Sequence, residues 1–235
     1  MKASAESTGN RQRISAYVSA PLDFGSIRVR PPLATPGQRI GLLGGSFNPA
    51  HEGHLRLSQF ALKRLRLDAV WWLVSPGNPL KLHDELESQP RRMDRCRQVA
   101  TDHRIVVTGF EAQLSTAFTA ATLRFLVRRY PTTHFVWLMG ADSLVSFDRW
   151  RHWRAILETM PVAVIDRPGW RLRGHSSKAA RRYARRYVPE NRARLLARMQ
   201  APAWTLLTVP LSPQSSTALR QGARAARSPA KVKPR

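Results

Sequence analysis

The sequence predicts an α/β fold in which a single doubly wound, mainly parallel sheet carries helices on both faces. Short apolar runs alternate along the chain with amphipathic helical stretches, which is the order of strands and helices that builds such a sheet. The runs are apolar at nearly every position, as expected for strands buried on both faces. The 235 residues, of which 43% are hydrophobic, suffice for the core of one large α/β domain or two small ones.

Strands and helices are expected to alternate from residue 39 onward. The expected strands are 39–45, 68–75, 104–110, 134–140, 161–168 and 205–211, and the expected helices are 54–65, 89–102, 119–130 and 151–160. Trp71 and Trp72 fall inside the second strand, so we expect both in the core. Cys96 falls in a helix and is expected to be inert. As the single cysteine, it excludes an internal disulfide framework and a cysteine-based zinc site.

The two ends of the chain differ in composition from the part between them. Residues 1–38 are polar and rich in proline and are interpreted as a flexible leader, and residues 223–235 are expected to form a disordered basic tail. The domain is therefore predicted to span 39–222. No apolar run approaches the roughly 20 residues of a membrane span, and the N-terminus lacks the apolar centre of a secretory signal. The sequence thus predicts a cytoplasmic protein without a membrane partner.

The chain is strongly basic, with a formal net charge of +24 from 39 Lys and Arg against 15 Asp and Glu. A field of this sign attracts phosphates of any kind, so charge alone does not separate nucleic acids from nucleotides. Much of the excess lies in residues 171–198, where Glu190 is the single acid, and in the tail. We favour a solvated helix face over a nucleic-acid surface, because no aromatic stacking platform repeats along the run. No dedicated nucleic-acid partner is expected.

The stretch GGSFNPAHEGH (44–54) directly follows the first expected strand, where open α/β sheets bind ligands. It could be a tight turn, a metal site or a phosphate site. Glycines let the backbone approach a ligand, and a helix start offers N–H groups to an anion. His51 and His54, three apart, can point the same way. A metal would need more ligands, such as His83 and Asp84, whose spacing does not demand one. Phosphate is favoured, although neither G-x-G-x-x-G nor the Walker A motif is present.

Two short motifs, GGSFNPAHEGH (44–54) and SSTALR (215–220), resemble those of the nucleotidylyltransferase superfamily. GGSFNPAHEGH is similar to its signature G-[GT]-[ST]-F-[DN]-P-x-H-x-G-H, and SSTALR (215–220) is similar to its second signature. The blocks VWWLVSPGNPLK, FTAATL, FVWLMGADSLVSFDRW and VIDRPG most resemble the bacterial nicotinate-nucleotide adenylyltransferases, so the similarity covers about 39–222. The resemblance implies a Rossmann-like sheet. Asn48 stands where Asp is frequent in the family, and Gln214 interrupts the usual apolar approach to the second motif.

The resemblance implies an ATP site at the carboxyl ends of the strands. In it, His51 and His54 contact the phosphates, and Arg220 is the third catalytic residue. The implied ATP-binding residues are Gly44, Gly45, Ser46, Phe47, His51, His54, Gly140, Asp142, Ser215, Ser216, Thr217 and Arg220. No resident metal is expected, since Mg²⁺ arrives on the ATP phosphates.

The resemblance likewise implies a site for the acceptor mononucleotide. Its residues are Asn78, Lys81, Phe118, Thr119, Trp150 and Arg151. Trp150 can stack on the pyridine ring, but its surroundings suit core packing equally well. Asn78 is either a turn former or a mononucleotide contact. Phe118 replaces a frequent Tyr, which puts a hydroxyl contact there in doubt.

The activity implied is in-line attack of the nicotinate mononucleotide phosphate on the α-phosphorus of ATP, with release of pyrophosphate. One alternative is another acceptor, either nicotinamide mononucleotide or phosphopantetheine. Another is a basic nucleic-acid-binding protein that uses RRYARRY (181–187). A class I tRNA synthetase would need a tRNA-reading region and a K-M-S-K-S loop, which this sequence does not show. Whether the chain forms a homo-oligomer is left open.

Overall fold

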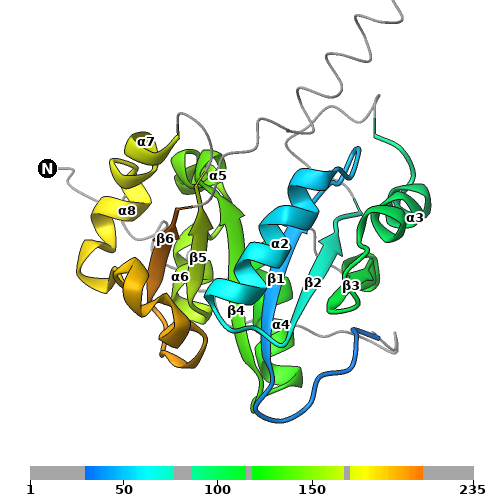
Figure 1. Cartoon of the computed structure of the whole chain (residues 1–235), viewed down its shortest axis with the longest axis horizontal. Helices are drawn as coiled ribbons and strands as arrows, with labels where there is room; N and C mark the ends of the chain where they lie inside the picture. Colours follow the sequence, from blue (N-terminus) through cyan, green and yellow to red (C-terminus); the bar gives the residue numbers. More distant parts are fainter. Residues whose placement is uncertain (1–29, 77–85, 115–117, 167–169, 209–235) are drawn as a thin grey trace, which may run out of the picture.

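The computed structural model describes residues 30–76, 86–114, 118–166 and 170–208. Its strands are β1 (Arg39–Gly45), β2 (Ala69–Val74), β3 (Ile105–Thr108), β4 (His134–Gly140), β5 (Val162–Ile165) and β6 (Trp204–Leu207). They form one sheet in the order β3-β2-β1-β4-β5-β6, in which every neighbouring pair is parallel (Figure 1). The doubly wound parallel sheet is therefore confirmed. The chain reverses its direction of winding between β1 and β4, where such sheets bind ligands.

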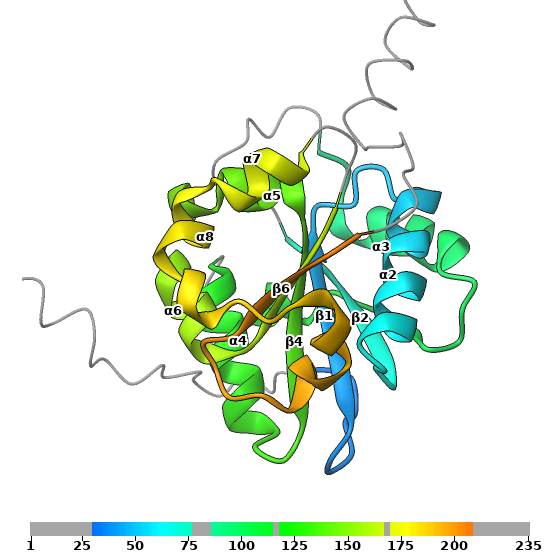
Figure 2. The same cartoon turned by 60° about the vertical axis from the view of Figure 1, so that its left-hand side comes forward.

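Helices cover both faces of the sheet (Figure 2). One face carries α2 (Glu52–Arg64), α3 (Gln89–Val99) and the 3-10 helix η5 (Glu190–Arg198), and the other carries α4 (Thr119–Arg129), α5 (Ala141–Val145), α6 (Trp153–Thr159), α7 (Arg171–His175) and α8 (Lys178–Arg182). Three short 3-10 turns are η2 (Phe110–Gln113), η3 (Phe147–Arg149) and η4 (Ala184–Arg186). The four predicted helices correspond to α2, α3, α4 and α6.

Side chains of each strand alternate between the two faces, because successive residues of a strand point in opposite directions. Trp71 and Trp72 illustrate this alternation. Trp71 packs with Phe135 and Tyr130 on the α4 face, whereas Trp72 packs with Phe47 on the α2 face. Both tryptophans are buried, so their predicted place in the core is confirmed.

The arginine-rich segment 171–198 wraps around the edge strand β6. Its first part buries Ala179, Ala180 and Tyr183 against the α4 face, and its second part buries Ala193, Leu196 and Ala197 against the α2 face. Its ten Lys and Arg side chains are all exposed. A covered edge strand has no free row of backbone groups to pair with another chain. This arrangement agrees with a solvated helix face. The short helices α7 and α8 were not predicted as separate elements.

Residues 30–38 lie beside the C-terminal end of α4. Tyr130 donates its hydroxyl hydrogen to the Pro32 carbonyl at 2.8 Å, and the Gly37 N–H donates to the Thr132 carbonyl at 2.8 Å. The predicted start of the domain at residue 39 lies within the described range 30–76, where β1 begins, whereas its predicted end at 222 and the basic tail lie outside the described residues. The limits of the domain stay predictions. Within those ranges, none of the helices combines the length and the apolar character needed to cross a bilayer.

Candidate active site

The turn after β1 has an unusual backbone. Phe47 has a φ of 48°, a left-handed conformation that a bulky residue rarely adopts. Its ring is buried and lies nearly parallel to Trp72, with the ring centroids 5.2 Å apart. Gly44, within β1, lies directly over Trp137, and a Cβ at this position would collide with Cη2 of that indole. The absence of a side chain at Gly44 is therefore required by the tryptophan beneath it, whatever the backbone binds.

His51 and His54 cap the start of α2 with their ring nitrogens. His51 Nδ1 accepts from the Gly53 N–H at 3.1 Å, and His54 Nδ1 accepts from the His51 N–H at 3.3 Å. This is a capping box in which two imidazoles replace the usual hydroxyl and carboxylate. An imidazole nitrogen that accepts carries no proton, so each neutral ring holds its proton on Nε2. The ring centroids lie 3.9 Å apart, so the two rings are side by side.

A buried hydrogen-bond chain fixes His54 against the sheet. Trp72 Nε1 donates to Ser58 Oγ at 2.7 Å, and Ser58 Oγ donates to the His54 carbonyl at 2.8 Å. Phe47 also contacts the imidazole, with its ring centroid 4.8 Å from that of His54. Ser58 and Trp72 are fully buried. Because buried hydrogen bonds are costly to break, this chain ties the start of α2 to β2 at the residue that carries the second imidazole.

Arg92, in the first turn of α3, binds the backbone just beyond the ends of β1 and β2. Arg92 is fully buried and donates to backbone carbonyls of Ser46 (2.6 Å), Ser75 (2.8 Å), Pro76 (3.3 Å) and Glu87 (2.8 Å). Burial lowers the pKa of its guanidinium, and nearby groups, Cys96 first, raise it less. Arg92 was not among the residues predicted from the sequence. A signal was present, because Arg92 and Cys96 share the buried stripe of an otherwise polar helix.

The residues predicted on β4 lie at the same sheet edge as the β1 turn. Gly140 ends β4 and precedes α5, and Asp142 lies in the first turn of α5. The β1–β4 pairing joins Leu43 to Leu138, so two residues further along Gly45 stands level with Gly140. Gly45, Gly140 and Asp142 therefore lie at the same end of the sheet, at the carboxyl ends of β1 and β4. Asp142 is partly buried.

The described residues predicted for the acceptor are gathered on the α4 side of the sheet. Phe118 precedes α4 and Thr119 is its first residue. The Arg151 guanidinium lies over the Phe118 ring, with Cζ 4.6 Å from the centroid, as in cation–π contacts. Trp150 is partly buried and packs edge-on against Trp137, whose tip underlies Gly44. The Trp137 ring thus links the acceptor group to the last residues of β1.

Glu111 is a titratable group near this acceptor side. It lies in η2, just beyond β3, and burial raises its pKa from 4.5 to about 7, while a hydrogen bond with Thr122 of α4 opposes the shift. It was not among the predicted site residues.

Six predicted site residues lie outside the described ranges. They are Asn78, Lys81, Ser215, Ser216, Thr217 and Arg220. His83 and Asp84, considered as extra metal ligands, also lie outside. Over the described ranges, no three His, Cys, Asp or Glu side chains come together as metal ligands.

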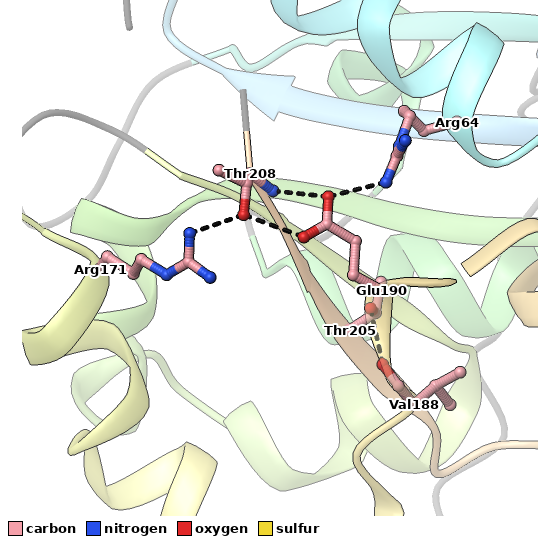
Figure 3. Close-up of polar contacts among 6 residues, drawn as sticks. All are labelled: Arg64, Arg171, Val188, Glu190, Thr205 and Thr208. Atoms are coloured by element: carbon pink, nitrogen blue, oxygen red, sulfur yellow. Dashed lines mark hydrogen bonds and ion pairs between the residues drawn. The ribbon is translucent and has the colours of Figure 1, made fainter. Parts of the chain in front are cut away.

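The end of β6 is held by a polar cluster on the surface (Figure 3). Glu190 accepts from the Thr208 N–H at 3.0 Å, from Thr208 Oγ1 at 2.9 Å and from Arg64 Nη2 at 2.8 Å. Arg171 Nη1 donates to Thr208 Oγ1 at 2.6 Å. One carboxylate therefore joins the end of β6 to the last turn of α2, and Arg171 brings in α7.

The chain is similar to a known class of nucleotide-transferring proteins. The model of the cytidylyltransferase-like family matches residues 42–222, and the chain belongs to that family. The solved Plasmodium falciparum nicotinic acid mononucleotide adenylyltransferase complexed with NaAD has the same fold. It has a TM-score of 0.61 and 14% identity, and the match covers 78% of this chain and 83% of that one.

Curated bacterial relatives narrow the family further. A probable nicotinate-nucleotide adenylyltransferase of Methylorubrum extorquens is 58% identical over 77% of this chain and 98% of the relative. Those of Cereibacter sphaeroides and Rhizobium johnstonii are 52% and 49% identical, over 79% and 81% of this chain and 97% and 96% of the relatives. The chain belongs to the nicotinate-nucleotide adenylyltransferase family, which confirms the identification made from the two motifs together with the sequence blocks between them.

Proposed function

We propose that this chain transfers the adenylyl group of ATP to nicotinate mononucleotide, yielding nicotinate adenine dinucleotide and pyrophosphate, a step of NAD biosynthesis. The observation that carries the proposal is the pair of imidazoles at the switch point, whose Nδ1 atoms accept backbone hydrogens and leave Nε2–H as the donor. Support comes from relatives of that name at 49–58% identity. The structural neighbours complexed with NaAD and with APC have the same fold.

The reaction requires positioning more than chemistry from the protein. A phosphate oxygen of the mononucleotide attacks the α-phosphorus of ATP and forms a new P–O bond. The bond from the α-phosphorus to the oxygen that bridges it to the β-phosphate breaks. The bonding electrons leave with pyrophosphate. His51 and His54 donate Nε2–H to phosphate oxygens and stabilise the charge that spreads over them. The chain forms no covalent bond to the nucleotide.

The remaining assignments divide between the two substrates. ATP is bound by the turn Gly44–Phe47 and by Gly140 and Asp142, and its leaving phosphates by Ser215, Ser216, Thr217 and Arg220. The acceptor is bound by Asn78, Lys81, Phe118, Thr119, Trp150 and Arg151. Mg²⁺ enters as part of the substrate MgATP, since the donors around the β1 turn are N–H groups, which suit phosphate oxygens. We place the reaction in the cytoplasm.

A substrate panel tests the acceptor assignment. Purified protein is given MgATP with nicotinate mononucleotide, nicotinamide mononucleotide or phosphopantetheine, and pyrophosphate release is followed. We expect the highest kcat/KM with nicotinate mononucleotide. No release with that acceptor, or a higher kcat/KM with either of the others, would show the assignment to be wrong.

The nucleic-acid alternative has a separate signature. A nucleic-acid-binding protein would bind RNA or DNA tightly, lose affinity steeply with salt and keep that affinity in His54→Ala. A chain without turnover on any acceptor that binds in this way would favour the alternative.

A further inference from the structure

Arg92 is a buried cation whose position is not explained by its own helix. It lies in the first turn of α3, where the helix dipole disfavours a positive charge, and burial lowers the pKa of its guanidinium. The carboxylate of nearby Glu87 forms an ion pair with Arg95 at 2.9 Å, whereas Arg92 binds the Glu87 backbone. The helix dipole and the burial therefore both disfavour a positive charge at Arg92. The hydrogen bonds that the guanidinium donates to backbone carbonyls must offset both effects.

The guanidinium holds segments that are far apart in the chain. Nη1 donates to Ser46, at the end of β1, and Nη2 donates to Ser75 and Pro76, at the end of β2. These carbonyls lie beyond the strands, and the Ser75 N–H still bonds to the Gly45 carbonyl. The flat guanidinium therefore lies between the turn that leads to His51 and the turn after the neighbouring strand.

A second side chain of the same helical turn extends this link to β3. Gln89 Nε2 donates to the Val74 carbonyl at 2.6 Å and to the Gly109 carbonyl at 3.3 Å. Gly109 lies close beneath, because a Cβ there would come within 2.6 Å of Met93 Sδ. The first turn of α3 thus binds backbone carbonyls at the ends of β1, β2 and β3.

We propose that Arg92 is a positioning residue for adenylyl transfer. It holds the turn that presents the paired imidazoles at a fixed distance from the turn after β2, so that ATP and acceptor meet in line. This inference rests on the proposed function. A planar guanidinium donates from three separate nitrogens, which here bind carbonyls of different segments, whereas the three donors of a lysine ammonium all radiate from one nitrogen and cannot reproduce this spread. Since a displacement of about 1 Å can cost about 100-fold in rate, losing the guanidinium should affect kcat first.

The test compares Arg92→Lys with Arg95→Lys, a matched change at an exposed position of the same helix. We expect Arg92→Lys to lower kcat about 100-fold, while the Kd values of a non-hydrolysable ATP analogue and of the mononucleotide, each measured alone, change less than about threefold. Arg95→Lys should match the wild type. Assays are run well below Tm, where a purely structural role would leave kcat per folded molecule unchanged.

A second variant covers a failure of the lysine variant to fold. Arg92→Gln removes the buried charge and keeps an N–H donor, and the same split between kcat and the Kd values is expected. A folded variant with kcat within threefold of wild type overturns the proposal, as does a loss of ATP affinity equal to the loss of kcat. If the wild type itself releases no pyrophosphate with nicotinate mononucleotide, the proposed function fails instead.

Discussion

The ends of β1 and β2 and the end of β6 are each held by one charged side chain that binds the backbone, but in opposite surroundings. At β1 and β2, the Arg92 guanidinium is fully buried and binds only carbonyls among the described residues. At β6, the Glu190 carboxylate binds an N–H, a hydroxyl and Arg64, and the two charged side chains are 26% and 41% exposed. The cation Arg92 binds backbone carbonyls, which accept hydrogen bonds, and the anion Glu190 binds a backbone N–H, which donates one.

The difference in burial predicts a difference in energy. Removing a buried charged side chain leaves the buried polar groups that it had bonded without a hydrogen-bond partner and without access to water. This lowers the free energy of unfolding by several kcal/mol. A surface ion pair contributes about 1 kcal/mol or less, because water screens it and replaces it. We therefore expect the region at the ends of β1, β2 and β3, the buried half, to be rigid and sensitive to substitution. The end of β6, the exposed half, should tolerate substitution.

The largest effect is expected at His54, in the buried half. His54→Asn places an acceptor near Nδ1 and keeps the cap but loses the Nε2–H donor. His54→Gln keeps an amide donor near Nε2, and its side-chain oxygen can still accept from the His51 N–H, because glutamine is a usual residue at this position of a capping box. We expect turnover to fall at least about 100-fold in His54→Asn with the unfolding free energy little changed, and to fall less in His54→Gln. His103→Ala, at a side chain that is 92% exposed, is the control. Near-normal turnover in His54→Asn would contradict the donor role.

Glu111 provides the next test, because it titrates within the buried half. Its folded pKa of about 7 lies above the unfolded value of 4.5. Stability is therefore full below pH 4.5 and declines as the pH rises through 7, by up to about 3 kcal/mol. In Glu111→Gln this decline should disappear, while the surface change Glu52→Gln should leave it. Urea unfolding between pH 4.5 and 8 measures it. Parallel profiles for wild type and Glu111→Gln would show that the carboxyl is not the cause.

The smallest effect is expected at Glu190, in the exposed half. Glu190→Gln can still accept from Thr208 but no longer pairs with the Arg64 charge, so we expect an unfolding free energy lower by about 0.5–1 kcal/mol. A double-mutant cycle with Arg64→Gln isolates the pair. A coupling energy above about 2 kcal/mol would remove the distinction between the two halves.

The fold was largely predictable because its strands are apolar throughout. The bounds 39–45 and 134–140 agree with β1 and β4, whose buried runs end in glycine. The start of α2 was placed at His54 and lies at Glu52, because the cap is formed by imidazoles and the usual capping residues are absent. The short helices α7 and α8 lie in a chain segment too rich in arginine to show their buried alanines as a periodic stripe.

The site was predictable where side chains define it and hidden where the backbone does. The two histidines carry a motif, and the structure adds which nitrogen of each ring accepts. Arg92 binds carbonyls 16, 17 and 46 positions away, and a carbonyl leaves no signature in a sequence. Glu190 meets Arg64 across 126 positions. Contacts of this kind follow from the sheet order, which is known only once the chain is folded.

The tautomers of His51 and His54 test the central claim most directly. Two-dimensional ¹H–¹⁵N spectra that correlate ring nitrogens with ring carbon-bound hydrogens distinguish a protonated Nε2 from a protonated Nδ1. We expect both imidazoles to carry the proton on Nε2 in the free protein, and their Nε2 resonances to shift when a non-hydrolysable ATP analogue binds. A proton on Nδ1 of either ring, or Nε2 resonances that ignore the nucleotide, would contradict the account.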